Sequence, residues 1–290
     1  MGIRMKNFFI ITNKQKDEDL KITHDIQDFL KLHNCSYKTQ ITNDISGAND
    51  CYTNPRDIPE EAECILVLGG DGTLLQAAND TLASGIPLIG VNLGTLGYLA
   101  EVELVNIEDA LMALIEDKAK VVNRMLLEGC ILRNGEQLEA AQALNDIVLA
   151  RLGSLCILNF NIYVNDMFLK GYHADGIIIA TPTGSTGYNM SAGGPIVEPK
   201  AELMVLTPIC PHTLNTRSII LAPEDTVTVE IAAGRDGRTQ QMEVSYDGKH
   251  KVTLVTGDRI QITQSSQKAK ILKLNKVSFL EVLHKKMSET

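Results

Sequence analysis

The segment that most constrains the fold is "ECILVLGGDGTLLQAAND", which runs from Glu63 to Asp80. An apolar run over 64–68 reads as a buried strand, two glycines end it, and a helical pattern begins at about Thr73. A strand, a glycine turn and a helix in this order are typical of a βα unit in a parallel sheet. The turn holds one carboxylate, Asp71. A single acid at this place requires an explanation.

The first third of the chain repeats the same alternation. We expect a strand over 7–12, a helix over 17–33, a loop over 43–61 and a further strand from Ile86. The expected helix carries apolar residues at spacings that place them on one face, namely Ile22, Ile26, Phe29 and Leu30. The β-α-β-α order predicts a largely parallel sheet covered by helices.

The pattern changes near Arg124, where short extended runs are separated by turn dipeptides. These dipeptides, which are typical of antiparallel hairpins, are Asn134-Gly135, Asn165-Asp166, Asp236-Gly237 and Asp247-Gly248. The last segment is helical again, with Phe279, Leu283 and Met287 at helical spacing. We therefore predict an α/β domain made of residues 1–124 and 276–290, and an all-β antiparallel domain made of residues 125–275.

Composition narrows the classes of function. The net charge of −9 repels nucleic-acid phosphates, so we expect no nucleic-acid partner. No apolar run approaches the ~18 residues of a membrane span, and the opening apolar stretch is too short for a secretory signal, so a cytoplasmic protein is expected. The six cysteines form no CxxC pair, which indicates reduced thiols without a disulfide framework or a thiolate metal site.

The glycine turn has two possible interpretations. Gly69, Gly70 and Gly72 allow positive φ and the close approach of a ligand, and the start of the next helix offers unpaired N–H groups to a phosphate. The alternative is that Asp71 only caps the helix. A Walker-type GKS or GKT and a GxGxxG fingerprint are both missing from the sequence. A phosphate would therefore have to be bound in another way.

A second group of polar residues lies in "HADGIIIATPTGSTGYNMSAGGP", from His173 to Pro195. Its apolar strand, 177–180, opens into a loop rich in Ser, Thr and Gly, which suits sugar hydroxyls and phosphate oxygens. A Ser/Thr/Gly-rich surface loop is the alternative. Two weaker signals have equally good structural explanations. They are "VNLGTLGYLAE", whose Tyr98 could shape a slot for adenine or nicotinamide, and "LNDIVLAR", whose Asn145-Asp146 could hold a ribose.

Taken in order, these segments resemble the NAD kinase family. The resemblance is carried by "GGDGT", "NLGTLGYL", "NDIVLAR", "DGIIIATPTGSTGYNMSAGGPI", "LTPICPHTL" and "VSYDG". The TPTGST stretch is highly specific, whereas GGDGT also occurs in lipid kinases and phosphofructokinases. The resemblance implies the two-domain fold above, with a C-terminal helix that returns to the first domain. It also implies an active site in the crevice between the domains and a homo-oligomer, either a dimer or a tetramer.

The implied reaction transfers the γ-phosphate of ATP to the 2′-hydroxyl of the adenosine ribose of NAD. Mg²⁺ would be held mainly by the phosphates, with no protein ligand assigned. The resemblance makes Asp71 the general base, since a carboxylate with an ordinary pKa of ~3.9 is ionised and can accept the hydroxyl proton. The implied NAD and ATP contacts are Asp71, Gly72, Asn145, Asp146, Asp175, Thr186, Gly187, Tyr188, Asn189 and Ser191. Weaker candidates are His173, Cys210 and Lys249, with Tyr98 as a possible pocket wall.

The chain departs from the family pattern at four positions. Asn145-Asp146 stands where the family usually has Asn-Glu, and Gly187 replaces the Ala of TAY. Thr95 and His173 stand where many members have His and Arg. The departures at Asp146 and Gly187 leave room for a second function, a non-catalytic dinucleotide-binding regulator. A GGDGT-type lipid kinase is a weaker alternative, because the chain lacks a GTGND-like turn and a membrane-facing stretch.

Overall fold

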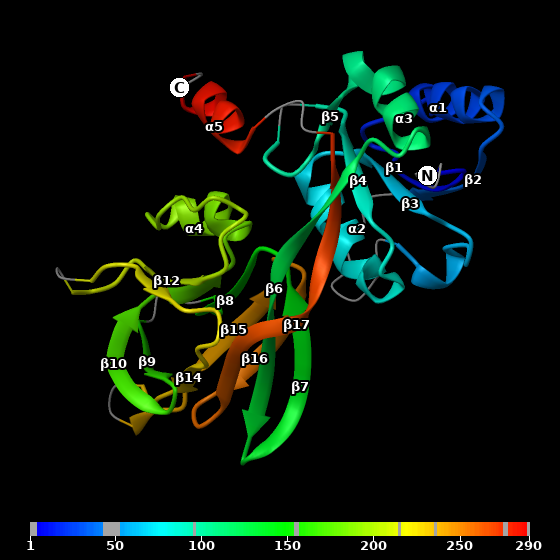
Figure 1. Ribbon diagram of the computed structural model, residues 1–290. Coiled ribbons are helices and arrows are strands. Elements are labelled where there is room, and N and C mark those ends of the chain that lie inside the picture. The colour runs from blue at the N-terminus through cyan, green and yellow to red at the C-terminus, as the bar shows by residue number, and fades with distance from the viewer. Residues whose placement is uncertain are drawn as a thin grey trace. The chain divides into compact units, whose positions relative to one another are not determined.

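The computed structural model describes residues 5–42, 53–94, 97–153, 157–213, 216–234, 237–274 and 278–288. The chain forms two compact units, Met1–Arg124 with Ala269–Thr290, and Met125–Lys268 (Figure 1). It leaves the first unit within β6 (Lys120–Arg133) and returns within β17 (Arg259–Lys273). The return lies at Ala269 rather than at residue 276, because the apolar end of β17 belongs to the first unit, where Leu272 is part of the core.

The first unit is built on a parallel sheet. Its strands run in the order β2-β1-β3-β4, and both β5 and the end of β17 also pair with β4 in parallel. Their bounds are β1 Asn7–Asn13, β2 Ser36–Thr42, β3 Cys64–Gly69, β4 Leu88–Asn92 and β5 Val102–Glu103. β3 and β4 are buried along their whole length, as is expected for strands covered on both faces.

Helices cover both faces of this sheet. α1 (Lys21–Leu32) and α3 (Ile107–Ile115) share one hydrophobic core with the strands, whereas α2 (Asp71–Thr81) packs on the opposite face (Figure 1). The predicted apolar face of the first helix is confirmed, since Ile26 and Leu30 are core residues and Ile22 and Phe29 pack against them. Gly90 lets α2 approach, because a Cβ at this position would lie 2.8 Å from Leu74 Cδ2.

Parts of this unit differ from the expectation. α1 begins at Lys21 rather than at residue 17, because Asp17 lies before the helix and accepts hydrogen bonds from the N–H groups of Ile22 and Thr23. β2 and α3 are two elements that the sequence did not predict. Within 43–61, residues 43–52 lie outside the described ranges, and a short 3₁₀ helix, η1 (Pro55–Asp57), follows.

The second unit is antiparallel, as predicted. One sheet has the order β13-β12-β11-β8-β15-β16, and the facing strands are β10-β9-β14-β17 with the β6–β7 hairpin. The core between them contains residues of both sets, including Leu149 and Phe160. The remaining bounds are β7 Glu136–Ala143, β8 Asp146–Arg151, β9 Leu158–Val164, β10 Met167–Ala174, β11 Gly176–Ala180, β12 Met204–Ile209, β13 Ile219–Leu221, β14 Val227–Ile231, β15 Gln241–Tyr246 and β16 His250–Val255.

Three of the predicted turns join paired strands. Asn134-Gly135, Asn165-Asp166 and Asp247-Gly248 all have positive φ and connect β6–β7, β9–β10 and β15–β16. The turn predicted at Asp236-Gly237 does not make a hairpin, because β14 pairs with β9 and β17 whereas β15 belongs to the other sheet. Asp236 itself lies outside the described residues.

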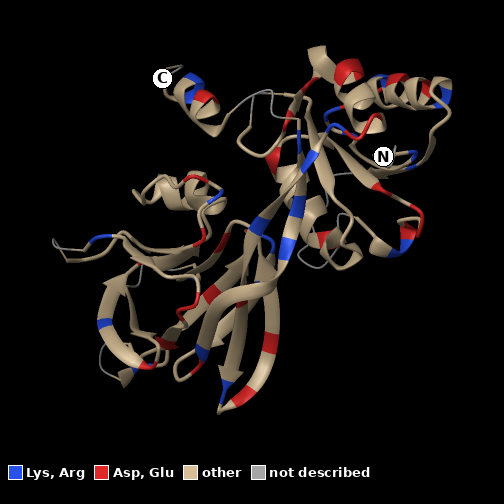
Figure 2. Ribbon diagram, viewed as in Figure 1, with Lys and Arg blue, Asp and Glu red and all other residues tan. Residues whose placement is uncertain are grey.

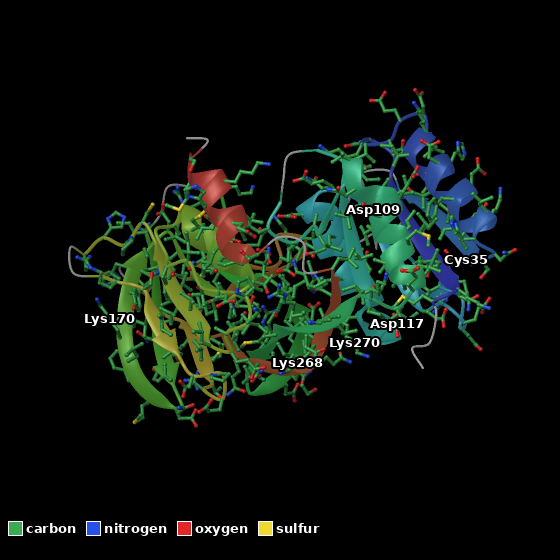
Figure 3. The ribbon with its side chains drawn as sticks, turned by 45° about the horizontal axis from the view of Figure 1, so that its top comes forward. Cys35, Asp109, Asp117, Lys170, Lys268 and Lys270 are labelled. Carbon is green, nitrogen blue, oxygen red and sulfur yellow. The ribbon has the colours of Figure 1, made fainter. Side chains whose placement is uncertain are left out.

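The C-terminal helix, α5 (Phe279–Ser288), is present and belongs to the first unit. The Phe279 ring lies 6.1 Å from that of Tyr98, and Lys285 Nζ is 4.0 Å from Glu103 Oε1. Lysines and arginines are interspersed with acids in both units (Figure 2). Among the described residues, no helix is long and apolar enough to cross a membrane. Four cysteines fall in the described ranges and all are free thiols, including the buried Cys35 (Figure 3).

Candidate functional site

Asp71 is the first residue of α2, directly after the strand that the sequence predicted. Its Oδ2 accepts a hydrogen bond from the N–H of Tyr98 at 2.6 Å, and its Oδ1 accepts those of Leu99 and Ala100, both at 3.1 Å. The helix has Gly70 at its N-cap and no side-chain capping bond. The capping alternative is therefore wrong, because the carboxylate binds a different segment of the chain.

The carboxylate of Asp71 retains one free acceptor position. A carboxylate offers about four lone-pair sites, and the three backbone N–H groups fill three of them. The remaining site is on Oδ2, and the side chain is half-buried rather than enclosed. Asp71 can therefore accept one further hydrogen bond, from a hydroxyl or a water. The half-buried phenol of Tyr98 neighbours it, since partial burial and then the charge of Asp71 raise the pKa of Tyr98.

The glycines near Asp71 have different roles from those expected. Gly69, Gly70 and Gly72 do not have positive φ, and Gly70 is extended at φ −117°. A Cβ at Gly70 or Gly72 would meet nothing within 4 Å, so there is open space beside the turn. Sterics require a glycine at Gly69, where a Cβ would lie 2.5 Å from Thr73 Oγ1, and at Gly97, where a Cβ would lie 1.9 Å from Asp71 Oδ1. The sequence did not single out Gly97, although it lies in "NLGTLGYL".

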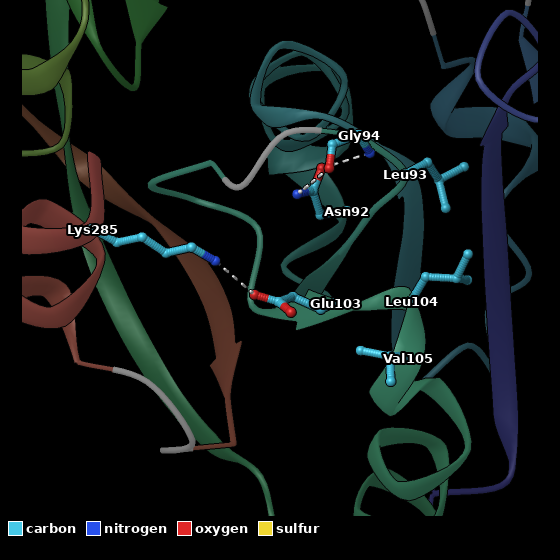
Figure 4. Close-up of a pocket in the computed structure, with 7 residues that line it drawn as sticks. All are labelled: Asn92, Leu93, Gly94, Glu103, Leu104, Val105 and Lys285. Atoms are coloured by element: carbon cyan, nitrogen blue, oxygen red, sulfur yellow. Dashed lines mark hydrogen bonds and ion pairs between the residues drawn. The ribbon is translucent and has the colours of Figure 1, made fainter. Parts of the chain in front are cut away.

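A pocket of about 370 Å³ opens at the carboxyl end of β4 (Figure 4). Its lining residues in the described part of the chain are Asn92, Leu93, Gly94, Glu103, Leu104, Val105 and Lys285. The pocket borders the glycine turn, because the N–H of Leu93 donates to the carbonyl of Gly69. Tyr98, expected as a possible wall, is not among these residues, and Lys286 Nζ lies 4.7 Å from its ring centroid. Thr95 lies outside the described residues.

In the second unit, the dipeptide Asn145-Asp146 lies at the start of β8, against the polar loop. The loop is held there by the N–H of Thr181, which donates to the carbonyl of Asn145 at 2.8 Å. Gly184 is required for this packing, because a Cβ would lie 2.0 Å from the Asn145 carbonyl oxygen. Gly187 faces the dipeptide more loosely, since a Cβ at this position would lie 3.6 Å from Asn145 Nδ2 and 3.8 Å from Asp146 Oδ2. The structure thus brings three predicted site residues together.

The two side chains of this dipeptide differ from ordinary surface groups. Asn145 Oδ1 is buried and accepts no hydrogen bond from the described residues. Asp146 is only 6% exposed, and burial together with the nearby charge of Asp247 raises its pKa to about 7. A buried acceptor without a partner and a buried acid that resists ionisation are costly in a folded protein. Such groups are typical of binding sites rather than of strand edges.

Several side chains of the loop make hydrogen bonds inside the protein, whereas the sequence indicated them only as ligand contacts. Thr181 Oγ1 donates to the Leu144 carbonyl, and Ser185 Oγ donates to that of Pro182. Asn189 is fully buried, and its amide bonds the carbonyls of Ser185 and Pro195 while its oxygen accepts from Thr207. The accessible groups of the loop are Thr186, Gly187, Tyr188 and Ser191, with Tyr188 46% exposed.

The remaining predicted contacts form a second group at the other end of β11. Asp175 precedes this strand and forms an ion pair with Arg151 at 3.5 Å, whereas Thr181 and Asn145 lie beyond its far end. At 3.3 Å per residue the two ends are roughly 20 Å apart. His173 and Cys210 lie with Asp175, since the Asp175 N–H donates to Ile209 and the His212 N–H donates to His173. Lys249 lies with the first group, in the β15–β16 turn.

The acids and histidines do not supply a metal site by themselves. Within the described ranges, no group of three or more His, Cys, Asp or Glu side chains is placed to hold a metal ion. Asp71 is a single carboxylate with a single free acceptor position.

Comparison with known proteins identifies the family of both units. The ATP-NAD kinase N-terminal domain model matches residues 8–119, and the ATP-NAD kinase C-terminal domain model matches residues 144–274. The chain belongs to the NAD kinase family. The resemblance found in the sequence is therefore confirmed, and both units are covered by the family's models.

Full-length relatives support this membership. The NAD kinase of Agathobacter rectalis is 46% identical over 98% of this chain and 99% of its own, and that of Lachnoclostridium phytofermentans is 42% identical over 98% and 100%. Among solved structures, yeast NADH kinase complexed with NADH has a TM-score of 0.81 at 23% identity, covering 98% of this chain and 88% of its own. At this identity the likeness shows the NAD kinase fold alone.

Proposed function

We propose that this chain transfers the γ-phosphate of ATP to the 2′-hydroxyl of the adenosine ribose of NAD, giving NADP and ADP. Family membership over the full length supports the reaction. The observation that carries the assignment to residues is the Asp71 carboxylate, which is fixed by three backbone N–H groups with one acceptor position left. Because its free site can accept one proton, we assign Asp71 as the general base.

The second unit supplies the contacts to the dinucleotide in this proposal. Asn145 Oδ1 is an unpaired acceptor and Asp146 is a buried acid beside it, so together they can accept hydrogen bonds from ribose hydroxyls. The exposed ring of Tyr188 offers a face for stacking on a base. Thr186, Gly187 and Ser191 complete the accessible edge of the loop. The part of the dinucleotide that lies farther from Asn145-Asp146 has three candidate contacts, Asp175, His173 and Cys210.

Mg²⁺ fits this site as a companion of ATP rather than as a resident ion. Mg²⁺ usually binds through one or two carboxylates and substrate phosphates, and the described residues offer no larger cluster of acids. When bound, it would neutralise phosphate charge and help the transfer. Residues at the glycine turn would then need only to admit the triphosphate, for which Gly70 and Gly72 leave space.

We also keep a homo-oligomer and a cytoplasmic location as predictions.

The proposal is tested with the purified chain, ATP, Mg²⁺ and NAD, with the product detected by an NADP-specific dehydrogenase. We expect NADP to form in an amount equal to the ADP released. Binding of NAD without any ADP would favour the regulator alternative. ATP-dependent phosphorylation of diacylglycerol or sphingosine, with none of NAD, would favour a lipid kinase and contradict the proposal.

A further inference from the structure

A carboxylate outside the predicted site holds the backbone that carries the ribose-binding dipeptide. Asp247 is the first of the three residues, 247–249, in the turn between β15 and β16, and its φ is 50°. Its Oδ2 accepts the N–H of Leu144 at 2.7 Å, and its Oδ1 accepts those of Asn145 and Asp146 at 2.8 and 3.0 Å. The sequence identified Asp247 only as a turn residue, because its partners are about a hundred positions away.

These three N–H groups need a partner that the sheet does not give them. They lie where β7 ends at Ala143 and β8 begins at Asp146, so the chain changes direction there. A buried N–H without an acceptor destabilises a fold, and one carboxylate satisfies three of them at once. The carbonyl side of the same segment is also fixed, since Leu144 and Asn145 accept from the Thr181 hydroxyl and N–H.

We propose that Asp247 is a positioning residue for phosphoryl transfer, which fixes the backbone of 144–146 so that Asn145 and Asp146 present their side chains to the ribose of the dinucleotide. This inference rests on the function proposed above. Asp247 does not need to touch the substrate. Three of its acceptor sites are filled by the backbone N–H groups of residues 144–146, whereas Asn145 Oδ1 is a buried acceptor with no partner among the described residues.

The charge of Asp247 has a second consequence for its neighbour. Ala180, paired with Asp146 on β11, carries no charge, and Tyr246 on β15 uses its hydroxyl to bond the carbonyl of Gly129. Burial raises the pKa of Asp146, and the charge of Asp247 raises it further; the cation Lys249 lies in the same turn. Removing this charge should make Asp146 ionise at lower pH. Loosening of the turn would act in the same direction by letting water reach Asp146, so a variant that keeps the charge is needed to separate the two effects.

The test compares Asp247→Asn with the wild type. Asparagine keeps the size of the side chain but turns an N–H₂ group toward one of the backbone N–H groups, so one donor loses its acceptor. We expect the KM for NAD to rise about tenfold, the KM for ATP to stay within about twofold, and the pH midpoint of kcat/KM for NAD to move down. Asp225→Asn is the control, because Asp225 also closes a turn through a backbone N–H, that of Ala222.

A second readout needs no ligand and no turnover. Amide hydrogen exchange at residues 144–146 should become at least about tenfold faster in Asp247→Asn and stay unchanged in Asp225→Asn. Asp247→Glu, which keeps the charge but lengthens the side chain, should speed exchange without lowering the pH midpoint. Unchanged exchange at 144–146 in Asp247→Asn would overturn the positioning role. If exchange rises but the wild type makes no NADP, the proposed function fails and the structural role of Asp247 stands.

Discussion

Two aspartates in this chain use the same arrangement, one in each unit. Asp71 accepts the N–H groups of residues 98–100, and Asp247 accepts those of residues 144–146. Three consecutive amides converge on one side chain in each case, so both acids fix a loop. Asp71 was predicted from its glycine turn, whereas its partners were not, because hydrogen bonds between segments 27 to 29 residues apart leave no local pattern.

Gly97 gives the first prediction at this scale. Its Cβ would lie 1.9 Å from Asp71 Oδ1, so Gly97→Ala must displace the carboxylate. We expect kcat for NAD phosphorylation to fall by roughly 10²-fold, the size of a general-base contribution, in a protein that still folds. Gly94→Ala is the matched control, because its Cβ would meet only Lys16 Nζ at 3.8 Å. Equal kcat values in the two variants would contradict the role of Gly97.

Asp146 gives a prediction about stability and pH. Its folded pKa of about 7 lies above the ordinary value, so between about pH 4 and pH 7 the folded state retains a proton that the unfolded state has lost. The free energy of unfolding therefore falls as pH rises through this window. Asp146→Asn removes the effect and should be more stable than the wild type by roughly a few kcal/mol at pH 8, with little difference at pH 4. Urea unfolding of the variant and the wild type at both pH values measures this difference in the free energy of unfolding. The same difference at pH 4 and pH 8 would contradict the raised pKa of Asp146.

At the scale of elements, the sequence predicted those that have strong local signals. The buried strands and the hairpins with Asn-Gly, Asn-Asp and Asp-Gly turns are present because periodicity and positive-φ residues act locally. β2 was missed because its polar residues alternate with half-buried ones at the edge of the sheet. β14 was assigned to the wrong partner because strand pairing depends on the core of the whole unit and not on the next turn.

The start of α1 gives the prediction at this scale. Asp17 is 5% exposed, and its carboxylate bonds two N–H groups of the first turn and the hydroxyl of Thr23. Asp17→Ala leaves these donors unpaired, so we expect a loss of about 1–2 kcal/mol in the free energy of unfolding. The exposed Asp19 provides the control, and Asp19→Ala should change stability by less than about 0.5 kcal/mol. Chemical denaturation of both variants measures these changes, and equal losses of stability would contradict the role of Asp17.

At the scale of the molecule, each unit contains some of the residues that the proposed reaction requires. The proposed general base, Asp71, lies in the α/β unit, and Asn145-Asp146 with the polar loop lie in the antiparallel unit. The identity of these residues could be predicted from the sequence because the family motifs are contiguous. What could not be predicted is which polar groups remain accessible, because Thr181, Ser185 and Asn189 look like ligand contacts in the sequence but are used inside the fold.

The central claim is that Asp71 takes the proton from the ribose hydroxyl of NAD, and Asp71→Asn tests it most directly. NADH fluorescence and ATP titration first establish that the variant still binds both nucleotides. We then expect kcat for NADP formation to fall by at least about 10²-fold, because an amide cannot accept the proton. A variant that binds both substrates and retains nearly the full rate would contradict the account.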